Sequence, residues 1–224
     1  MNWDQVVEKV TPYVVRIDTP TGYGTGFICL YNDDRTWCGI ATACHVVSDI
    51  DEWQQPIRIR YHDLTELVFL KESDRVIFLD WRADSAVIFF PNVGLKLPEH
   101  LIPLFPANKL IKIGAEIGWL GFPNIEAATL CFFSGNVSAQ KTSPNEYLID
   151  GAAVQGVSGG PVLCSTGVEG VQIIGLVSAY RPGRTATGSV PGLLYARDVS
   201  HFHDVISQVK SYDEAKHKKA QFQQ

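Results

Sequence analysis

Short segments rich in apolar and β-branched residues follow one another along most of this chain, with turn-forming residues between them. Their length and spacing are typical of an all-β sandwich or barrel rather than of alternating strands and helices. With 46% hydrophobic and 19% charged residues, the 224-residue chain can build a sizeable core. We expect strands at residues 13–19, 24–31, 37–42, 57–61, 66–71, 75–78, 85–90, 116–121, 129–140, 146–149, 161–164, 172–178 and 192–197.

Two helices and one irregular segment complete the expected pattern. A short helix is expected over residues 3–9, because Asn2 can cap it. A longer helix is expected at about 198–218, where apolar residues up to Tyr212 recur at helical spacing. We expect its apolar face to pack against the strands of residues 113–197. Residues 97–110 contain three prolines and predict an irregular crossover between two halves of the chain.

The segment from Gly156 to Pro161 places Ser158 between glycines and directly before an apolar run. Glycine adopts backbone conformations that other residues rarely reach, so the chain can turn tightly enough to direct several amide N–H groups at one point. Such a group of amides is an oxyanion hole. The turn therefore predicts a reactive hydroxyl beside an anion-stabilising site, although glycine-rich serine turns also occur in β proteins without catalytic function.

A serine hydroxyl is a weak nucleophile, so it needs a base and an acid that orients the base. His45 closes an apolar run and is expected at the end of a strand, with the side chain of Cys44 on the opposite face. Asp84 directly precedes a β-forming run, which makes the chain order His45, Asp84, Ser158. Asp80 is an alternative acid, and each residue taken singly could have an ordinary structural role.

The order of these residues and the segments around them resemble the trypsin-like, double β-barrel serine proteases. The closer resemblance is to the HtrA-type protease domain, because residues 6–17 lead into the Gly24 to Phe27 segment as those proteins begin. The resemblance covers roughly residues 5 to 206. It implies an all-β fold of two six-stranded antiparallel β-barrels with a C-terminal helix.

In this arrangement residues 1–224 form a single trypsin-like peptidase domain. Barrel one would span about 11–95, the crossover about 96–112, barrel two about 113–197 and the C-terminal helix about 198–218. HtrA-type proteins usually carry a peptide-binding PDZ domain after the protease, and this sequence shows no counterpart to it.

The resemblance implies a serine endopeptidase that cleaves peptide bonds through His45, Asp84 and Ser158 and an acyl-enzyme. It implies an oxyanion hole formed by Gly156, Val157 and Ser158. Within it, Ser178 matches the position whose hydroxyl contacts the catalytic carboxylate. The substrate-binding positions that the resemblance implies are Ala152, Ala153, Gln155, Ser178, Ala179 and Tyr180.

Substrate preference follows from Ala152, which the resemblance places at the base of the pocket for the residue before the scissile bond. An acid at this position would attract lysine or arginine. With alanine there, we expect cleavage after small or medium aliphatic residues. The residue before the nucleophile is Val157 where trypsin has an aspartate, so activation by a newly cut N terminus is not expected.

Two other functions share parts of this pattern. The first is a protease fold that serves as a catalytically silent binding module, which the complete set of three residues disfavours. The second is an esterase, because Gly156, Ser158 and Gly160 fit the Gly-x-Ser-x-Gly elbow. In that fold the histidine comes last in the chain and a helix follows the serine, whereas here His45 comes first and Pro161 opens a β-forming run.

Charge and cysteine content limit the partners. The formal net charge is −5 and no long basic block occurs, so we expect neither nucleic acid nor membrane as a partner, but a protein or peptide substrate and a possible regulatory protein. Five cysteines leave at least one thiol free, and no secretory signal opens the chain, which together predict a cytoplasmic location. No cofactor or metal is expected, because no cysteine pair has close ligand spacing.

Overall fold

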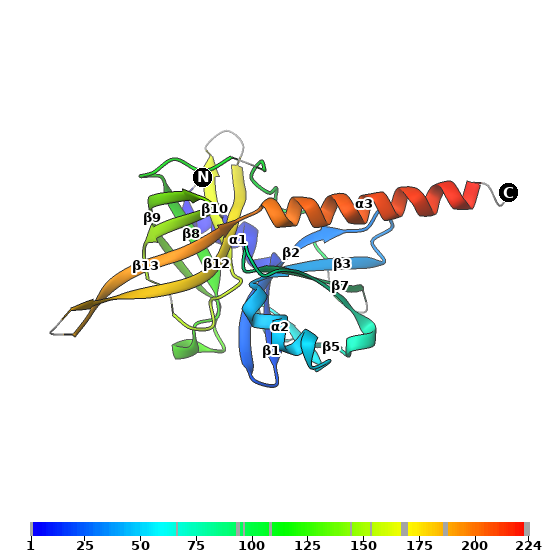
Figure 1. Cartoon of the computed structure of the whole chain (residues 1–224), viewed down its shortest axis with the longest axis horizontal. Helices are drawn as coiled ribbons and strands as arrows, with labels where there is room; N and C mark the ends of the chain where they lie inside the picture. The colour runs from blue at the N-terminus through cyan, green and yellow to red at the C-terminus, as the bar shows by residue number, and fades with distance from the viewer. Residues whose placement is uncertain are drawn as a thin grey trace.

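The computed structural model of this chain describes residues 2–65, 67–92, 95, 97–107, 109–143, 145–152, 154–166, 170–185 and 188–221. Two groups of antiparallel strands lie next to each other, and a long C-terminal helix runs from one across the other (Figure 1). This arrangement confirms the predicted mostly-β, trypsin-like fold. No helix in the described part of the chain has the length and apolarity to cross a membrane.

The chain opens with the short helix α1 (Trp3–Val10), close to the predicted bounds. The side chain of Gln5 accepts a hydrogen bond from the Asn2 N–H at 3.3 Å, so that one end of the helix is capped by its own sequence. The helix buries Val6 and Val10 against the core. A single turn, η1 (Thr11–Tyr13), then leads into the first strand.

The first unit is one seven-stranded sheet in the order β5-β4-β1-β2-β3-β7-β6. Its two edge strands, β5 and β6, are consecutive in the chain and are joined at the turn η2 (Glu72–Asp74), so the sheet curls back on itself. The seven strand segments expected here are all present, whereas the resemblance implied a barrel of six strands. The strands are β1 (Val14–Thr19), β2 (Gly22–Tyr31), β3 (Trp37–Thr42), β4 (Ile57–Tyr61), β5 (Leu67–Leu70), β6 (Val76–Asp80) and β7 (Ser85–Pro91).

The second unit is a closed barrel in the order β10-β13-β12-β11-β8-β9. Large side chains such as Trp119, Tyr147 and Ile149 fill its interior and are fully buried. The last two strands pair in a hairpin that extends well beyond the barrel (Figure 1), further than their apolar pattern predicted. The strands are β8 (Glu116–Gly121), β9 (Cys131–Thr142), β10 (Asn145–Asp150), β11 (Pro161–Thr166), β12 (Gly170–Thr185) and β13 (Gly188–Asp198).

The crossover between the two units contains no helix or strand in its described residues, as its prolines predicted. It is nevertheless fixed to the second barrel by backbone hydrogen bonds. The N–H of Phe105 donates to the carbonyl of Ile173 at 2.7 Å, and the N–H of Ile173 donates to the carbonyl of Pro103 at 2.9 Å. These bonds satisfy backbone groups that burial would otherwise leave unpaired.

The C-terminal helix α3 (Ser200–Gln221) packs against the first unit, so the prediction that it covers the second barrel is wrong. Phe202 is fully buried and meets Phe27 of β2 edge to face, with ring centroids 5.8 Å apart. The helix extends beyond the sheet on which it packs (Figure 1), and Tyr212, which was predicted on the buried face, is 70% exposed. The periodicity of the sequence identified the apolar face of α3, but it did not show how much of that face the sheet covers.

Replacing Phe202 with alanine should lower the free energy of unfolding by about 3 to 5 kcal/mol, because it leaves a cavity against Phe27. Urea denaturation monitored by circular dichroism would measure the change. The control is Tyr212→Ala on the same helix, which should have an effect within about 0.5 kcal/mol because its ring is largely exposed. Equal losses in the two variants would contradict this account of how the helix is held.

Candidate active site

His45 lies in the first turn of helix α2 (Cys44–Glu52), so the prediction of a strand end is wrong. The preceding strand β3 ends at Thr42. The buried residues Cys44, Val47 and Ser48 are spaced three and four apart, which is the helical pattern that the short apolar run concealed. The start of this helix places the imidazole at the rim of a pocket, with 50% of the side chain exposed.

Asp84 ends the turn between β6 and β7 in a left-handed backbone conformation, with φ +46°. Asp80, the alternative acid, has a different position. One of its carboxylate oxygens accepts the N–H groups of Arg82 and Ala83, each at 2.9 Å, and so shapes this turn. The structure therefore places Asp84, and not Asp80, against the imidazole of His45.

The Asp84 carboxylate binds donors from both units. The Nδ1 atom of His45 lies 3.0 Å from each carboxylate oxygen, and the backbone N–H of His45 donates to Oδ1 at 3.1 Å. Ser178 of β12 donates its hydroxyl to Oδ2. Burial by itself would raise the pKa of Asp84, but the bonds from His45 and Ser178 outweigh it and hold the pKa below its usual range.

Ser158 lies in a turn that two glycines make possible. Gly156 has φ +95° and Gly159 has φ +85°, both in the left-handed region. The turn packs closely on the first unit: the Thr25 hydroxyl donates to the Gly156 carbonyl at 2.8 Å, and the Thr25 N–H donates to the Ser158 carbonyl at 2.8 Å. A Cβ atom on Gly159 would lie 2.1 Å from the Thr25 carbonyl oxygen. Only glycine therefore allows this approach of the two units.

Two amide N–H groups of this turn are free. Among the described residues, neither Gly156 nor Ser158 donates its backbone N–H to an acceptor. The carbonyl of Gln155 accepts a hydrogen bond from the Asn124 N–H at 2.7 Å. In the trans peptide that joins Gln155 to Gly156, the Gly156 N–H points opposite to this carbonyl and therefore away from Asn124. Val157 differs from expectation: its N–H donates to the Val154 carbonyl at 3.3 Å and its side chain is buried, so it supplies no free donor.

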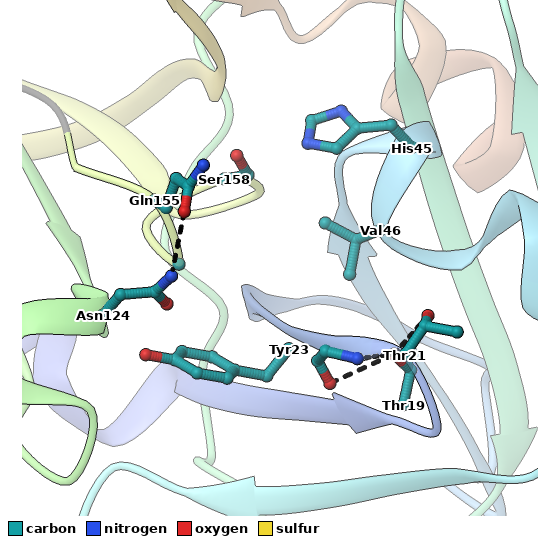
Figure 2. Close-up of a pocket in the computed structure, with 10 residues that line it drawn as sticks. Thr19, Thr21, Tyr23, His45, Val46, Asn124, Gln155 and Ser158 are labelled. Carbon is teal, nitrogen blue, oxygen red and sulfur yellow. Dashed lines mark hydrogen bonds between the residues drawn. The ribbon is translucent and has the colours of Figure 1, made fainter.

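His45, Gly156 and Ser158 line a pocket of about 420 Å³, shown in Figure 2. The imidazole of His45 is directed toward the side of the pocket that holds the Ser158 hydroxyl (Figure 2), but no hydrogen bond joins the two described side chains. Such contacts are often loose before substrate binds. The pocket is lined by Thr19, Thr21, Gly22, Tyr23, His45, Val46, Asn124, Gln155, Gly156 and Ser158.

Of the expected substrate-binding residues, Gln155 lines this pocket, and its side chain accepts a hydrogen bond from Asn124 at 3.2 Å. Ser178 contacts Asp84, as the resemblance implied. Ala152 and Ala179 are exposed and lie outside the pocket lining.

Two further substrate-binding predictions cannot be compared with the structure. Ala153 and the side chain of Tyr180 lie outside the described residues.

Sequence reasoning missed Tyr23, Thr25 and Asn124. Tyr23 and Asn124 line the pocket, and Thr25 holds the serine turn from the other unit. Thr25 lies within the segment that carries the family resemblance, but its role depends on a partner 131 positions away. Asn124 belongs to the short turn η3 (Asn124–Glu126), where no local motif indicates a contact with Gln155.

Cys44, next to His45, is not a competing nucleophile. Its side chain is buried, and burial together with the carboxylates of Asp84 and Asp80 raises the pKa of its thiol to about 11.

All five cysteines are free thiols, and the cytoplasmic location stays a prediction. In the part of the chain that the structure describes, no three His, Cys, Asp or Glu side chains are grouped closely enough to hold a metal ion.

A second serine and histidine meet directly behind Asp84. The Oγ atom of Ser85 lies 2.6 Å from Nδ1 of His201 on α3. Ser85 is fully buried, so a substrate cannot reach its hydroxyl. This pair therefore lies beside Asp84 but is closed to substrate.

Replacing Ser178 with alanine should raise the pKa of Asp84, because it removes a hydrogen bond to the ionised carboxylate. An acid whose pKa is depressed on folding stabilises the fold above its unfolded pKa, and this contribution is lost as pH falls through the folded pKa. The free energy of unfolding of the variant should thus rise less between acid and neutral pH than that of the intact chain. Carboxyl ¹³C NMR titration would measure the pKa, and Ser211→Ala on α3 is the control that should leave it unchanged.

Replacing Gly156 with alanine should lower the free energy of unfolding by at least about 1 to 3 kcal/mol, because the residue has φ +95° and a Cβ atom would lie 2.2 Å from the Phe122 carbonyl oxygen. Gly22→Ala is the matched control in the same pocket, since no atom lies within 4 Å of its added Cβ. Urea denaturation compares them. A Gly156→Ala protein as stable as Gly22→Ala would refute the strained-turn description.

With this geometry in place, comparisons with known proteins define the family. The Trypsin-like peptidase domain model matches residues 24–175, which include His45, Asp84 and Ser158. A search of curated proteins finds no significant match to this sequence.

Two solved structures share the fold. One is Rv3671c from Mycobacterium tuberculosis H37Rv, in the inactive form of its Ser343Ala mutant; it has a TM-score of 0.60 and 19% identity over 92% of this chain and 90% of that chain. The other is a serine endoprotease from Yersinia pestis, with a TM-score of 0.65 and 19% identity over 94% of this chain and 67% of that chain. Because the family model covers more than half of the sequence, this chain belongs to the trypsin-like peptidase family.

Proposed function

We propose that this chain is a serine endopeptidase in which Ser158 is the nucleophile, His45 the general base and Asp84 the orienting acid. One observation carries the proposal. Gly156 and Ser158, whose amides donate to no acceptor among the described residues, line the same pocket as the His45 imidazole, which the Asp84 carboxylate holds by its Nδ1 atom. Nucleophile, base and anion-stabilising donors are the parts that acyl transfer needs.

In the first step, His45 Nε2 takes the proton of the Ser158 hydroxyl while the oxygen attacks the peptide carbonyl carbon. The carbonyl oxygen becomes an oxyanion, and the amides of Gly156 and Ser158 are positioned to donate to it. Each such donor contributes on the order of 3 kcal/mol to transition-state stabilisation. Asp84 accepts a hydrogen bond from the Nδ1–H group and stabilises the imidazolium without itself becoming protonated.

The tetrahedral intermediate then expels the amine, which receives the proton from His45, and an acyl-enzyme remains on Ser158. Water attacks the ester carbonyl, with His45 again acting as the base. The imidazole finally returns this proton to Ser158, which regenerates the hydroxyl as the acid product leaves. Two turns of the same proton cycle therefore account for both halves of the reaction.

Membership of the peptidase family implies peptide or protein substrates. Within that class we propose cleavage after small or medium aliphatic residues, because the family resemblance assigns Ala152, which lies outside the pocket of Figure 2, to the position where an acid would select basic residues. Mapping the cut sites in a denatured proteome treated with active protein or with Ser158→Ala would test this. Enrichment of lysine or arginine before the cut would contradict it.

A fluorophosphonate probe tests the nucleophile directly. We expect the intact chain to be labelled, Ser158→Ala to show no labelling, and the exposed-site control Ser211→Ala to be labelled as the intact chain is. Mass spectrometry of the labelled peptide identifies the modified serine. Labelling that persists in Ser158→Ala would refute this assignment, and absence of labelling in the intact chain would favour the silent binding module.

A further inference from the structure

The catalytic acid lies in a left-handed backbone conformation. Asp84 has φ +46°, a region that few residues other than glycine occupy, although aspartate reaches it more readily than most. Contacts on both sides of Asp84 hold it there. On its N-terminal side, Asp80 holds the turn through the N–H groups of Arg82 and Ala83.

On the C-terminal side of Asp84, the restraints are a strand pairing and a side-chain contact, both made by Ser85. Ser85 is the first residue of β7 and is fully buried, and its hydroxyl lies 2.6 Å from Nδ1 of His201. Ser85 also opposes Asp80 in the β6–β7 pairing. The two residues that flank the turn are thus paired with each other, and the hydrogen bond to His201 links Ser85 to helix α3.

Helix α3 brings this contact from the second barrel. The helix begins directly after β13, where Asp198 accepts hydrogen bonds from Ser200 at 2.5 Å and from Asn145 of β10 at 3.1 Å. One turn later, Phe202 packs on Phe27 of the first unit. His201 therefore lies near the start of the helix that runs from the second barrel across the first unit (Figure 1).

The imidazole of His201 suits a neutral hydrogen bond. Burial lowers its pKa, while the carboxylates of Asp80 and Asp204 act in the opposite direction. At neutral pH the ring can therefore bond to Ser85 without bringing a positive charge close to Asp84, where it would compete with His45 for the carboxylate.

We propose that His201 and Ser85 are positioning residues for the reaction: their hydrogen bond fixes the backbone of Asp84 so that both carboxylate oxygens stay aligned with His45. This proposal rests on the proposed function, since it names a support of the same triad. Loss of the bond lets the Asp84–Ser85 backbone relax toward an ordinary conformation. The carboxylate then moves away from Nδ1, and the base loses its orientation while the pocket that binds substrate is unchanged.

The test compares pairs of variants that differ in the hydrogen bond and little in shape. Ser85→Thr keeps the hydroxyl and Ser85→Val removes it, while His201→Gln keeps a polar group and His201→Leu removes it. We expect Ser85→Val and His201→Leu to lower kcat about 10-fold with KM within about twofold, because a small displacement of a catalytic group acts on the chemical step. Ser85→Thr should restore most of the activity.

A second readout needs no turnover. The proton between His45 Nδ1 and Asp84 gives a downfield ¹H NMR signal in the free protein, and we expect His201→Leu to broaden it or move it upfield. Val209→Ala is the control for a loosened helix, because Val209 is buried on α3 away from the site. It should lower stability but leave both kcat and the signal unchanged.

Each outcome decides between explanations. Unchanged kcat and an unchanged proton signal in His201→Leu would overturn the proposal, as would equal losses of kcat in Val209→Ala. If Ser85→Val fails to fold, the half-buried His201 variants carry the test alone. If the intact chain shows no Ser158-dependent reaction, the triad assignment fails, and the NMR signal still decides whether His201 positions Asp84.

Discussion

One carboxylate joins the two halves of this molecule. Asp84 comes from the curled sheet of the first unit, and its oxygens accept hydrogen bonds from His45 of that unit and from Ser178 of the second barrel. Such bonds to a largely buried charge are strong because little water competes for the carboxylate. The ionised Asp84 carboxylate thus fixes the His45 imidazole. It also holds the two units together near the serine turn.

Close approach of backbone to backbone is the second requirement of this interface. The serine turn lies against β2, where Thr25 bonds to the carbonyls of Gly156 and Ser158. Gly159 permits the contact because a side chain there would overlap the Thr25 carbonyl. The same folding of the turn leaves the amides of Gly156 and Ser158 without an acceptor among the described residues. The glycines of the motif are therefore needed for packing between the units and for the oxyanion site that we propose.

Local sequence predicted much of this arrangement. Strand segments, the crossover and both terminal helices follow from periodicity and turn residues, and the serine turn follows from its glycines. His45 was placed on a strand because four apolar residues in a short run do not distinguish a strand from a helical turn; the burial of Val47 and Ser48 does. The side of the molecule that α3 covers was also missed, since an amphipathic helix records that it packs but not against what.

By itself the sequence determined the residue types and their order: a glycine-held serine, a histidine, an aspartate before a strand, and enough β-forming segments for two barrels. Tertiary structure decided which of these groups meet. It selected Asp84 over Asp80, removed Val157 from the free donors, and added Asn124, Thr25 and His201 from distant segments. The physical reason is that hydrogen bonds and close contacts depend on distance in space, and pairs that lie from 31 to 131 positions apart leave no local pattern in one chain.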